Sequence, residues 1–292
     1  MSDRVGRTRA VVGPWSDVGV DAQAGRVPSI AVVVPTYNEA ENIPRLVERV
    51  EAVRAMLASP LELWFLDDRG GDATPEVVRS LARPWVHLVE RTGRRGLSAA
   101  VLEGFDRVDA DVVVVMDADL SHPPEAIPEL VLAVRGGADM AFGSRYVDGG
   151  SIDPSWTSFR RWNSRIATWL ARGIVRMSDP MSGFFAVARG RVVDPAIRGA
   201  IDPIGYKVGL EIAAKIRAAR ITEVPIHFAD RAAGTSKLGL EAQWAYLVHV
   251  LRLHRFRRPW LAMAGGLGLA LLVLLAAFGV LRATGAWNGL GS

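Results

Sequence analysis

Between residues 29 and 189, short apolar runs rich in β-branched residues alternate with segments whose apolar residues recur at helical spacing. This alternation predicts an α/β fold with a mainly parallel sheet. Several runs lack polar alternation, which is typical of strands covered by helices on both faces. The expected strands are 30–37, 61–68, 86–92, 111–119 and 139–146, and the expected helices are roughly 40–58, 74–82, 97–107 and 124–135.

Polar residues stand where most of these strands end. The first strand ends in PTYNE, the second in LDD, the fourth in MDAD and the fifth in GSRY. In open parallel sheets, ligands bind beyond the carboxyl ends of the strands. Carboxylates from separate strands would therefore meet a cation at one edge of the sheet, and this edge is the candidate site.

The pair Asp117 and Asp119 follows the run VVVVM directly. Their side chains point to the same side of an extended segment, where they repel unless a cation lies near them. Oxygen ligands favour Mg²⁺ or Mn²⁺. Two other interpretations remain open: a polar strand end that caps the next helix, and a phosphatase of the haloacid-dehalogenase type with Asp117 as nucleophile. Ser121 and the two preceding strand–helix units disfavour the phosphatase.

The composition excludes several other classes. The chain has 292 residues, a net charge of +4 and no cysteine, so it holds neither disulfides nor a thiolate metal site. No Lys/Arg run accompanies a nucleic-acid-binding motif, which predicts that nucleic acid is not a partner. Residues 1–28 lack periodicity and any apolar stretch of signal-peptide length, so we expect a flexible tail and no secretion.

The end of the sequence has the pattern of a membrane anchor. Residues 260–282 form an apolar segment whose first charge is Arg282, which is long enough to span a bilayer core of about 30 Å. Arginines crowd the preceding stretch, at Arg252, Arg255, Arg257 and Arg258. The positive-inside rule then predicts a single-pass anchor with the N-terminal part in the cytoplasm and a short tail at 283–292. The alternative is a buried helix at the end of a soluble protein.

Two further segments indicate contact with a membrane surface. Within 155–177, apolar residues including several tryptophans recur at helical spacing, and arginines occupy the other faces. This pattern is typical of an amphipathic helix at a membrane interface, and a core-facing helix with a solvated basic side is the alternative. Residues 241–259 form a second basic amphipathic segment that leads into the predicted anchor.

Six motifs carry a resemblance to a known family. In order, they are VVVPTYNEAENI, LDD with GDAT, MDADLSHPPE, FGSRY, DPMSGFFAVAR and VPIHFADRAAGTSKLG. Together they resemble the inverting glycosyltransferases of family two with the Rossmann-like GT-A fold, and within them the dolichyl- or polyprenyl-phosphate mannosyltransferases. The resemblance covers roughly residues 29–240, which we expect to form the GT-A domain.

The resemblance implies the following roles. The nucleotide-sugar site would comprise Pro35, Tyr37, Glu39, Leu66, Asp68, Asp117, Ala118, Asp119, Arg145, Arg231 and Lys237. Within it, Leu66 and Asp68 would touch the base, and Arg145 would face a phosphate. The metal, Mg²⁺ or Mn²⁺, would be held by Asp117, Asp119 and Ser121, and the acceptor's phosphate by Arg160 and Ser164.

The implied reaction transfers mannose from GDP-mannose to a polyprenyl phosphate, with inversion, at the cytoplasmic membrane face. An ionised lipid phosphate needs no general base, which is consistent with the lack of an obvious catalytic histidine; His122 reads equally well as a loop residue. Glu211 faces either the active site or solvent. The loop DDRGGDAT departs from the family's DDGSxDGT at Arg69, so a UDP-sugar donor stays an alternative, as does a non-catalytic nucleotide-sugar-binding protein.

Overall fold

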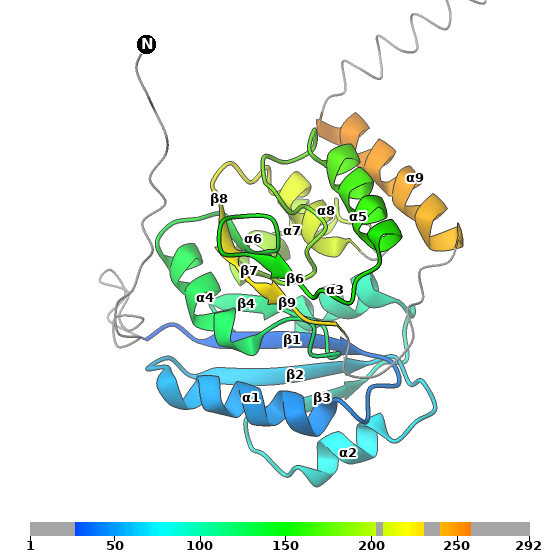
Figure 1. Ribbon diagram of the computed structural model, residues 1–292. Coiled ribbons are helices and arrows are strands. Elements are labelled where there is room, and N and C mark those ends of the chain that lie inside the picture. Colours follow the sequence, from blue (N-terminus) through cyan, green and yellow to red (C-terminus); the bar gives the residue numbers. More distant parts are fainter. Residues whose placement is uncertain (1–26, 203–206, 231–239, 258–292) are drawn as a thin grey trace, which may run out of the picture.

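The protein, described here from a computed structural model, is built around one large sheet (Figure 1). The structure describes residues 27–202, 207–230 and 240–257. The sheet has seven strands in the order β3-β2-β1-β4-β7-β5-β8, and a small second sheet pairs β6 with β9. The strands are β1 (Ile30–Thr36), β2 (Leu61–Asp67), β3 (Val86–Glu90), β4 (Val112–Val115), β5 (Met140–Ser144), β6 (Ser151–Ile152), β7 (Phe185–Ala188), β8 (Ile221–Pro225) and β9 (His227–Phe228).

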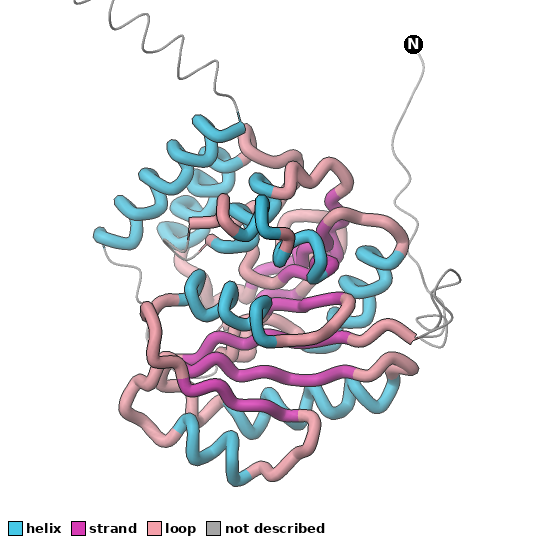
Figure 2. Tube along the Cα trace, turned by 180° about the vertical axis from the view of Figure 1, so that it is seen from behind, coloured by secondary structure: helices cyan, strands magenta, loops and turns pink. Residues whose placement is uncertain are grey.

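Helices cover both faces of this sheet, as Figure 2 shows from behind. They are α1 (Ile43–Met56), α2 (Thr74–Ser80), α3 (Leu97–Arg107), the 3-10 turn η2 (Pro124–Ala126), α4 (Ile127–Arg135), α5 (Ser158–Ala171), α6 (Arg189–Val193), α7 (Pro195–Arg198), α8 (Val208–Lys215) and α9 (Leu240–Arg257). Val32 of β1 packs in the core with α1 and α4, and its neighbour Val33 packs on the opposite side with α3. Because helices cover both faces, the ends of the strands are the parts of the sheet that remain open to ligands.

The predicted strands and helices are confirmed, and the differences lie at the ends of the strands. The predicted strand 111–119 ends at Val115, so Asp117 and Asp119 lie in the loop beyond it. The predicted strand 139–146 likewise ends at Ser144 and leaves Arg145 in a loop. In both places the chain leaves the sheet at the residues that carry the candidate chemistry.

One central strand is not predicted by the pattern. β7 lies between β4 and β5 and runs antiparallel to both, with Phe185 opposite Val115 and Phe142. The sheet is therefore mainly parallel with one reversed strand. Because β7 is reversed, the loop that leads into it lies at the carboxyl ends of β4 and β5.

Helices α5 and α9 lie side by side at one end of the molecule (Figure 1). The Tyr246 hydroxyl of α9 donates to the Ala167 carbonyl of α5 at 2.6 Å, and His254 Nε2 lies 3.0 Å from the Leu170 carbonyl. A Cβ at Gly173 would stand 2.7 Å from the His254 ring, so this glycine permits the close approach. These contacts fix which face of α9 is buried.

The segment 155–177 is shorter as a helix than expected and only partly exposed. Trp156 precedes α5 and is buried, and Ile174 and Met177 follow it in the core. Trp162 and Trp169 of α5 are exposed. The core interpretation therefore holds for part of this segment, and contact of its exposed tryptophans with a membrane interface stays a prediction.

Among the helices that the structure describes, none is both long and apolar enough to cross a bilayer. The predicted anchor at 260–282, the predicted tail at 283–292 and residues 1–26 of the predicted tail at 1–28 lie outside the described residues.

Candidate active site

The strand ends meet at one edge of the sheet, as the sequence predicts. β1 and β2 are in parallel register with Thr36 opposite Asp67, and the Thr36 hydroxyl donates to Asp67 Oδ1 at 3.0 Å. Asp67 is fully buried, and burial, only partly offset by this hydrogen bond, raises the pKa of its carboxyl. Asp67 therefore joins the two strand ends and is not exposed to a ligand.

The end of β2 carries the two residues that the resemblance assigns to the base. The Leu66 side chain is fully buried in the core, where it packs with the α3 face of the sheet, so contact of Leu66 with a base stays a prediction that only its backbone could meet. Asp68 forms a buried ion pair with Arg91 and accepts a hydrogen bond from the Gly96 amide at 2.7 Å. Arg91 also contacts Glu103 at 2.9 Å. These bonds make Asp68 an anchor for the loop before α3.

The unusual loop after β2 is folded against the loop after β1. Arg69 has a φ of 52°, so a non-glycine residue occupies a left-handed conformation there. Gly70 lies so close to Asn38 that an added Cβ would stand 2.9 Å from the Asn38 backbone nitrogen and closer still to its side chain. A residue without a side chain is therefore needed at position 70 for this close approach.

Side chains from the second loop also bind the backbone of the first. Asp72 accepts a hydrogen bond from the Ala40 amide at 3.1 Å, and the Glu39 amide donates to the Thr74 hydroxyl at 2.9 Å. Tyr37 is 37% exposed beside these contacts, and Pro35 is half-buried at the end of β1. Three of the predicted nucleotide-binding residues, Tyr37, Glu39 and Asp68, thus lie on two loops that hydrogen bonds hold together.

Gly70→Ala is expected to raise the KM for the nucleotide sugar about fivefold while leaving the KM for the acceptor unchanged. The added methyl would push the Asn38 loop away, and core-like overpacking costs about 1–3 kcal/mol. Steady-state kinetics with each substrate varied in turn would measure this. Gly71→Ala is the companion variant, because a Cβ at Gly71 meets no atom within 4 Å although its φ is 103°. Equal effects from both variants would attribute the result to backbone strain.

Asp117 and Asp119 follow β4 in a tight turn. The Asp117 side chain is 35% exposed, whereas Asp119 is buried. The Ser121 amide and hydroxyl donate to Asp119 Oδ1 at 3.1 and 2.6 Å. Ser121 was expected to contact the metal, but its side chain is buried and its hydroxyl orients Asp119. Ala118, between the two carboxylates, is buried as well.

His122 binds the backbone of Asp117, the other aspartate of the turn. The Asp117 amide donates to His122 Nδ1 at 3.0 Å, which makes Nδ1 an acceptor and the ring neutral. The ring is buried, stacks on Phe184 with centroids 5.2 Å apart and meets Phe228 edge-on. Burial lowers the pKa of His122 despite the nearby carboxylates. His122 is therefore a buried support of the carboxylate turn, which the sequence pattern did not distinguish from a loop residue.

Arg145 lies at the end of β5 in a buried ion pair. Its Nε and Nη2 donate to the two carboxylate oxygens of Asp179, each at 2.7 Å, and its backbone amide donates to Asp179 at 3.1 Å. The rings of Tyr146, Phe228 and Trp156 surround the guanidinium at 5.2, 5.2 and 5.9 Å. Burial opposes its charge, but the hydrogen bonds from Arg145 to Asp179, together with the negative charge of Asp179, outweigh burial and raise the Arg145 pKa.

Lys207 adds a cation that the sequence analysis did not assign to the site. It precedes α8, and its Nζ donates to the Met181 carbonyl at 2.7 Å. Burial, followed by repulsion from Arg145, lowers the pKa of Lys207 to about 8, while Asp117 and Asp179 act in the opposite direction. The charge of Lys207 therefore interacts with the carboxylates of both Asp117 and Asp179.

The remaining predicted residues are only partly covered. Arg231 and Lys237 lie outside the described residues, and so does the side chain of Arg160. Ser164 of α5 is half-buried, with its Oγ 2.9 Å from the Tyr146 hydroxyl. Glu211 is buried 3.0 Å from His249 and accepts a hydrogen bond from the Asp202 amide, so of its two interpretations the solvated face is wrong.

The carboxylates of Asp117 and Asp119 suit a divalent metal that is also held by a substrate. Among the residues that the structure describes, no group of three or more His, Asp or Glu side chains could hold a metal by itself. Asp117 and Asp119 provide two carboxylates on one short turn. Mg²⁺ is commonly bound by one or two carboxylates together with substrate phosphates, so these residues suit a metal that arrives with a diphosphate.

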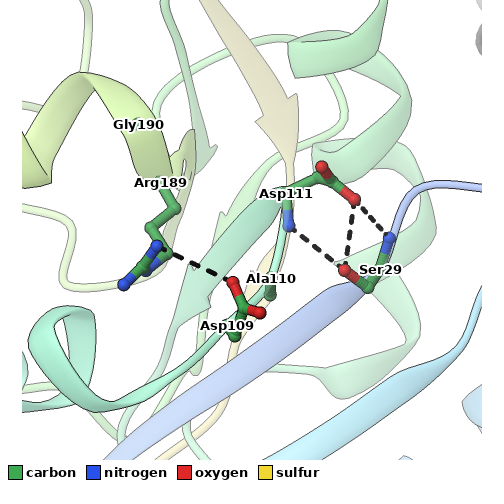
Figure 3. Close-up of a pocket in the computed structure, with 6 residues that line it drawn as sticks. All are labelled: Ser29, Asp109, Ala110, Asp111, Arg189 and Gly190. Carbon is green, nitrogen blue, oxygen red and sulfur yellow. Dashed lines mark hydrogen bonds and ion pairs between the residues drawn. The ribbon is translucent and has the colours of Figure 1, made fainter. Parts of the chain in front are cut away.

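A separate polar hollow lies at the opposite edge of the sheet (Figure 3). There Asp111 accepts hydrogen bonds from the Ser29 amide and hydroxyl at 2.8 and 3.1 Å, and Arg189 lies 3.9 Å from Asp109. These contacts fasten the start of β1 to the start of β4. The hollow is far from the strand ends that carry the candidate chemistry, and we assign it a structural role.

A GT-A-like sheet with paired carboxylates beyond its fourth strand defines the class as a glycosyltransferase. Residues 31–189 match the family model described as glycosyl transferase family 2. The chain belongs to this family.

Named relatives and solved structures agree with this class. The chain is 40% identical to a dolichol-phosphate mannosyltransferase of Pyrococcus furiosus over 78% of this chain and 64% of that protein. It is 38% identical to the Saccharomyces cerevisiae enzyme of the same name, over 78% and 87%. Glucosyl-3-phosphoglycerate synthase from Mycobacterium tuberculosis, solved with Mn²⁺, UDP-glucose and phosphoglyceric acid, has a TM-score of 0.59 over 87% and 86% at 18% identity, which shows the fold alone.

Proposed function

We propose that the protein transfers mannose from GDP-mannose to a polyprenyl phosphate and so forms a lipid-linked mannose. The identity to enzymes named dolichol-phosphate mannosyltransferase is the observation that carries this proposal, and the chain spans about two thirds of the Pyrococcus furiosus enzyme. The tied loops after β1 and β2 support a nucleotide site beside the paired carboxylates.

Asp117 and Asp119 would hold Mg²⁺ or Mn²⁺ together with the donor's diphosphate. A bound divalent ion supplies Lewis-acid stabilisation of the negative charge on a leaving nucleoside diphosphate. Ser121 and His122 keep the two carboxylates in place through the hydrogen bonds described above. The proposed metal ligands are therefore the two aspartates without Ser121.

The acceptor would be an ionised phosphate, so no residue needs to remove its proton. Cations would instead orient it, and the buried Arg145 and the half-buried Lys207 are two cations at this edge of the described structure. Direct attack on the anomeric carbon inverts it, so an α-linked nucleotide sugar would give a β-linked product.

A membrane surface would be reached through the exposed apolar side chains of α5 and α9. These are Trp162, Ile166 and Trp169 on α5 and Trp244, Leu247 and Leu251 on α9. We define them as the aromatic face. Tryptophan and leucine on paired basic helices favour the boundary between headgroups and acyl chains. This face supports association of the described domain with a cytoplasmic leaflet.

The test is transfer of labelled sugar into an organic extract. Membranes containing the full chain would receive polyprenyl phosphate, Mg²⁺ and labelled GDP-mannose, with UDP-glucose in parallel. Label from GDP-mannose in the lipid phase, abolished by EDTA, is the expected result. Label from UDP-glucose alone would overturn the donor, and no label from either would overturn the reaction.

A further inference from the structure

An aspartate–arginine pair lies just beyond each end of strand β5. Both aspartates are buried, but Arg191 of the first pair is 44% exposed. Before the first residue of β5, Asp139 is paired with Arg191 and accepts hydrogen bonds from the Ala219 and Arg220 amides at 2.8 Å. Beyond the last residue of β5, Arg145 is paired with Asp179. The two pairs have similar chemistry, but only the second lies at the candidate active site.

Asp179 binds one edge of the Arg145 guanidinium with both of its carboxylate oxygens. Its two oxygens take the Nε and Nη2 donors, so the Nη1 edge of the planar group is directed away from Asp179. Asp179 is fully buried, and three aromatic rings restrict the guanidinium from other sides. The orientation of Arg145 is therefore determined by Asp179.

A third carboxylate determines the position of Asp179. Glu223 of β8 accepts hydrogen bonds from the Asp179 amide at 3.0 Å and the Ser178 amide at 2.7 Å. It also accepts one from the Ser144 hydroxyl at 2.8 Å, at the last residue of β5. Glu223 thus fastens the loop before β7 to the end of β5.

We propose that Glu223 and Asp179 are positioning residues that preset Arg145 to bind a substrate phosphate. Arg145 would contact the phosphate, whereas Asp179 and Glu223 act through it. The inference rests on the proposed function, because it assumes a phosphorylated substrate at this edge.

The acceptor's phosphate is the source that the surroundings favour. Tyr146, directly after Arg145, has its hydroxyl 2.9 Å from Ser164 Oγ, and the Arg145 guanidinium lies over the Tyr146 ring. Ser164 belongs to α5, the helix that carries part of the aromatic face. A lipid phosphate arriving along α5 would therefore meet Arg145 before the nucleotide loops of β1 and β2.

The experiment compares Asp179→Asn with Asp139→Asn in full-length protein. In Asp179→Asn, the KM for polyprenyl phosphate is expected to rise about tenfold, with the KM for GDP-mannose within twofold of the parent. Asp139→Asn, the matched control, should leave both KM values unchanged even though its thermal midpoint falls. Glu223→Gln keeps one accepting oxygen and is expected to give a smaller rise of the same kind.

Several outcomes separate this inference from the proposed function. A parent protein without transfer activity would overturn the proposed function. An active parent whose Asp179→Asn and Glu223→Gln variants keep both KM values would overturn the positioning role. A rise confined to GDP-mannose would retain that role and move the phosphate to the donor. If Asp179→Asn does not fold, Glu223→Gln and Arg145→Lys decide, and unchanged acceptor KM values in both would contradict the inference.

Discussion

Replacing Asp119 with asparagine is expected to lower kcat/KM for sugar transfer by about 10²–10³-fold while leaving the fold intact, as is usual when a charge-stabilising group is removed. The asparagine oxygen can still accept the hydrogen bonds from the Ser121 amide and hydroxyl. The change therefore removes the negative charge but keeps the turn. Initial rates at saturating Mg²⁺, with circular dichroism as a check on folding, would measure it.

Asp109→Asn is the control for loss of a carboxylate. Asp109 is fully exposed at the opposite edge of the sheet, so its rate should stay within about twofold of the parent. A near-normal rate for Asp119→Asn would contradict the assignment of the metal and diphosphate to this turn.

Replacing Trp162, Trp169 and Trp244 together with alanine is expected to raise the apparent KM for vesicle-embedded polyprenyl phosphate about 10²-fold. The three side chains are 61%, 69% and 70% exposed. A tryptophan side chain presents about 150–250 Å², and apolar burial contributes about 25 cal/mol per Å². If about a third of the exposed part enters the bilayer, each ring contributes about 1 kcal/mol, and three account for about 10²-fold.

A water-soluble short-chain acceptor separates membrane contact from catalysis. Its KM should stay unchanged in the triple variant, because none of the three rings lies among the residues that hold Arg145. Met56→Ala, at the exposed end of α1, is the control for loss of apolar surface elsewhere. Equal loss with both acceptors, or an unchanged KM in vesicles, would contradict membrane docking through the aromatic face.

The sequence predicts the parallel part of the fold well because each strand is a local signal. The run VVVV at 112–115 is buried along its whole length and continues directly into the predicted carboxylates. The carboxyl-end rule then locates Asp117 and Asp119 without knowledge of long-range contacts. The convergence of these strand ends could therefore be predicted.

The features that the sequence does not reveal depend on pairing between residues that are far apart in the chain. β7 has four residues, too few for a clear periodic pattern, and its place depends on pairing with both β4 and β5. Asp179 is 34 residues from Arg145, and no local spacing indicates that they are paired. The place of Leu66 at a strand end likewise does not indicate that its side chain points into the core.

The reversed strand β7 also sets the distance between the ends of β4 and β5 at the candidate active site. Neighbouring strands lie about 4.8 Å apart, so the intervening strand separates the ends of β4 and β5 by about 10 Å. Free-energy effects of substitutions at that separation usually add. The carboxylate turn and the Asp179 side share one partner, however, because the charge of Lys207 interacts with both Asp117 and Asp179. An engineer who leaves Lys207 in place could therefore combine altered sugar preference with altered lipid preference and forecast the double variant from the single ones.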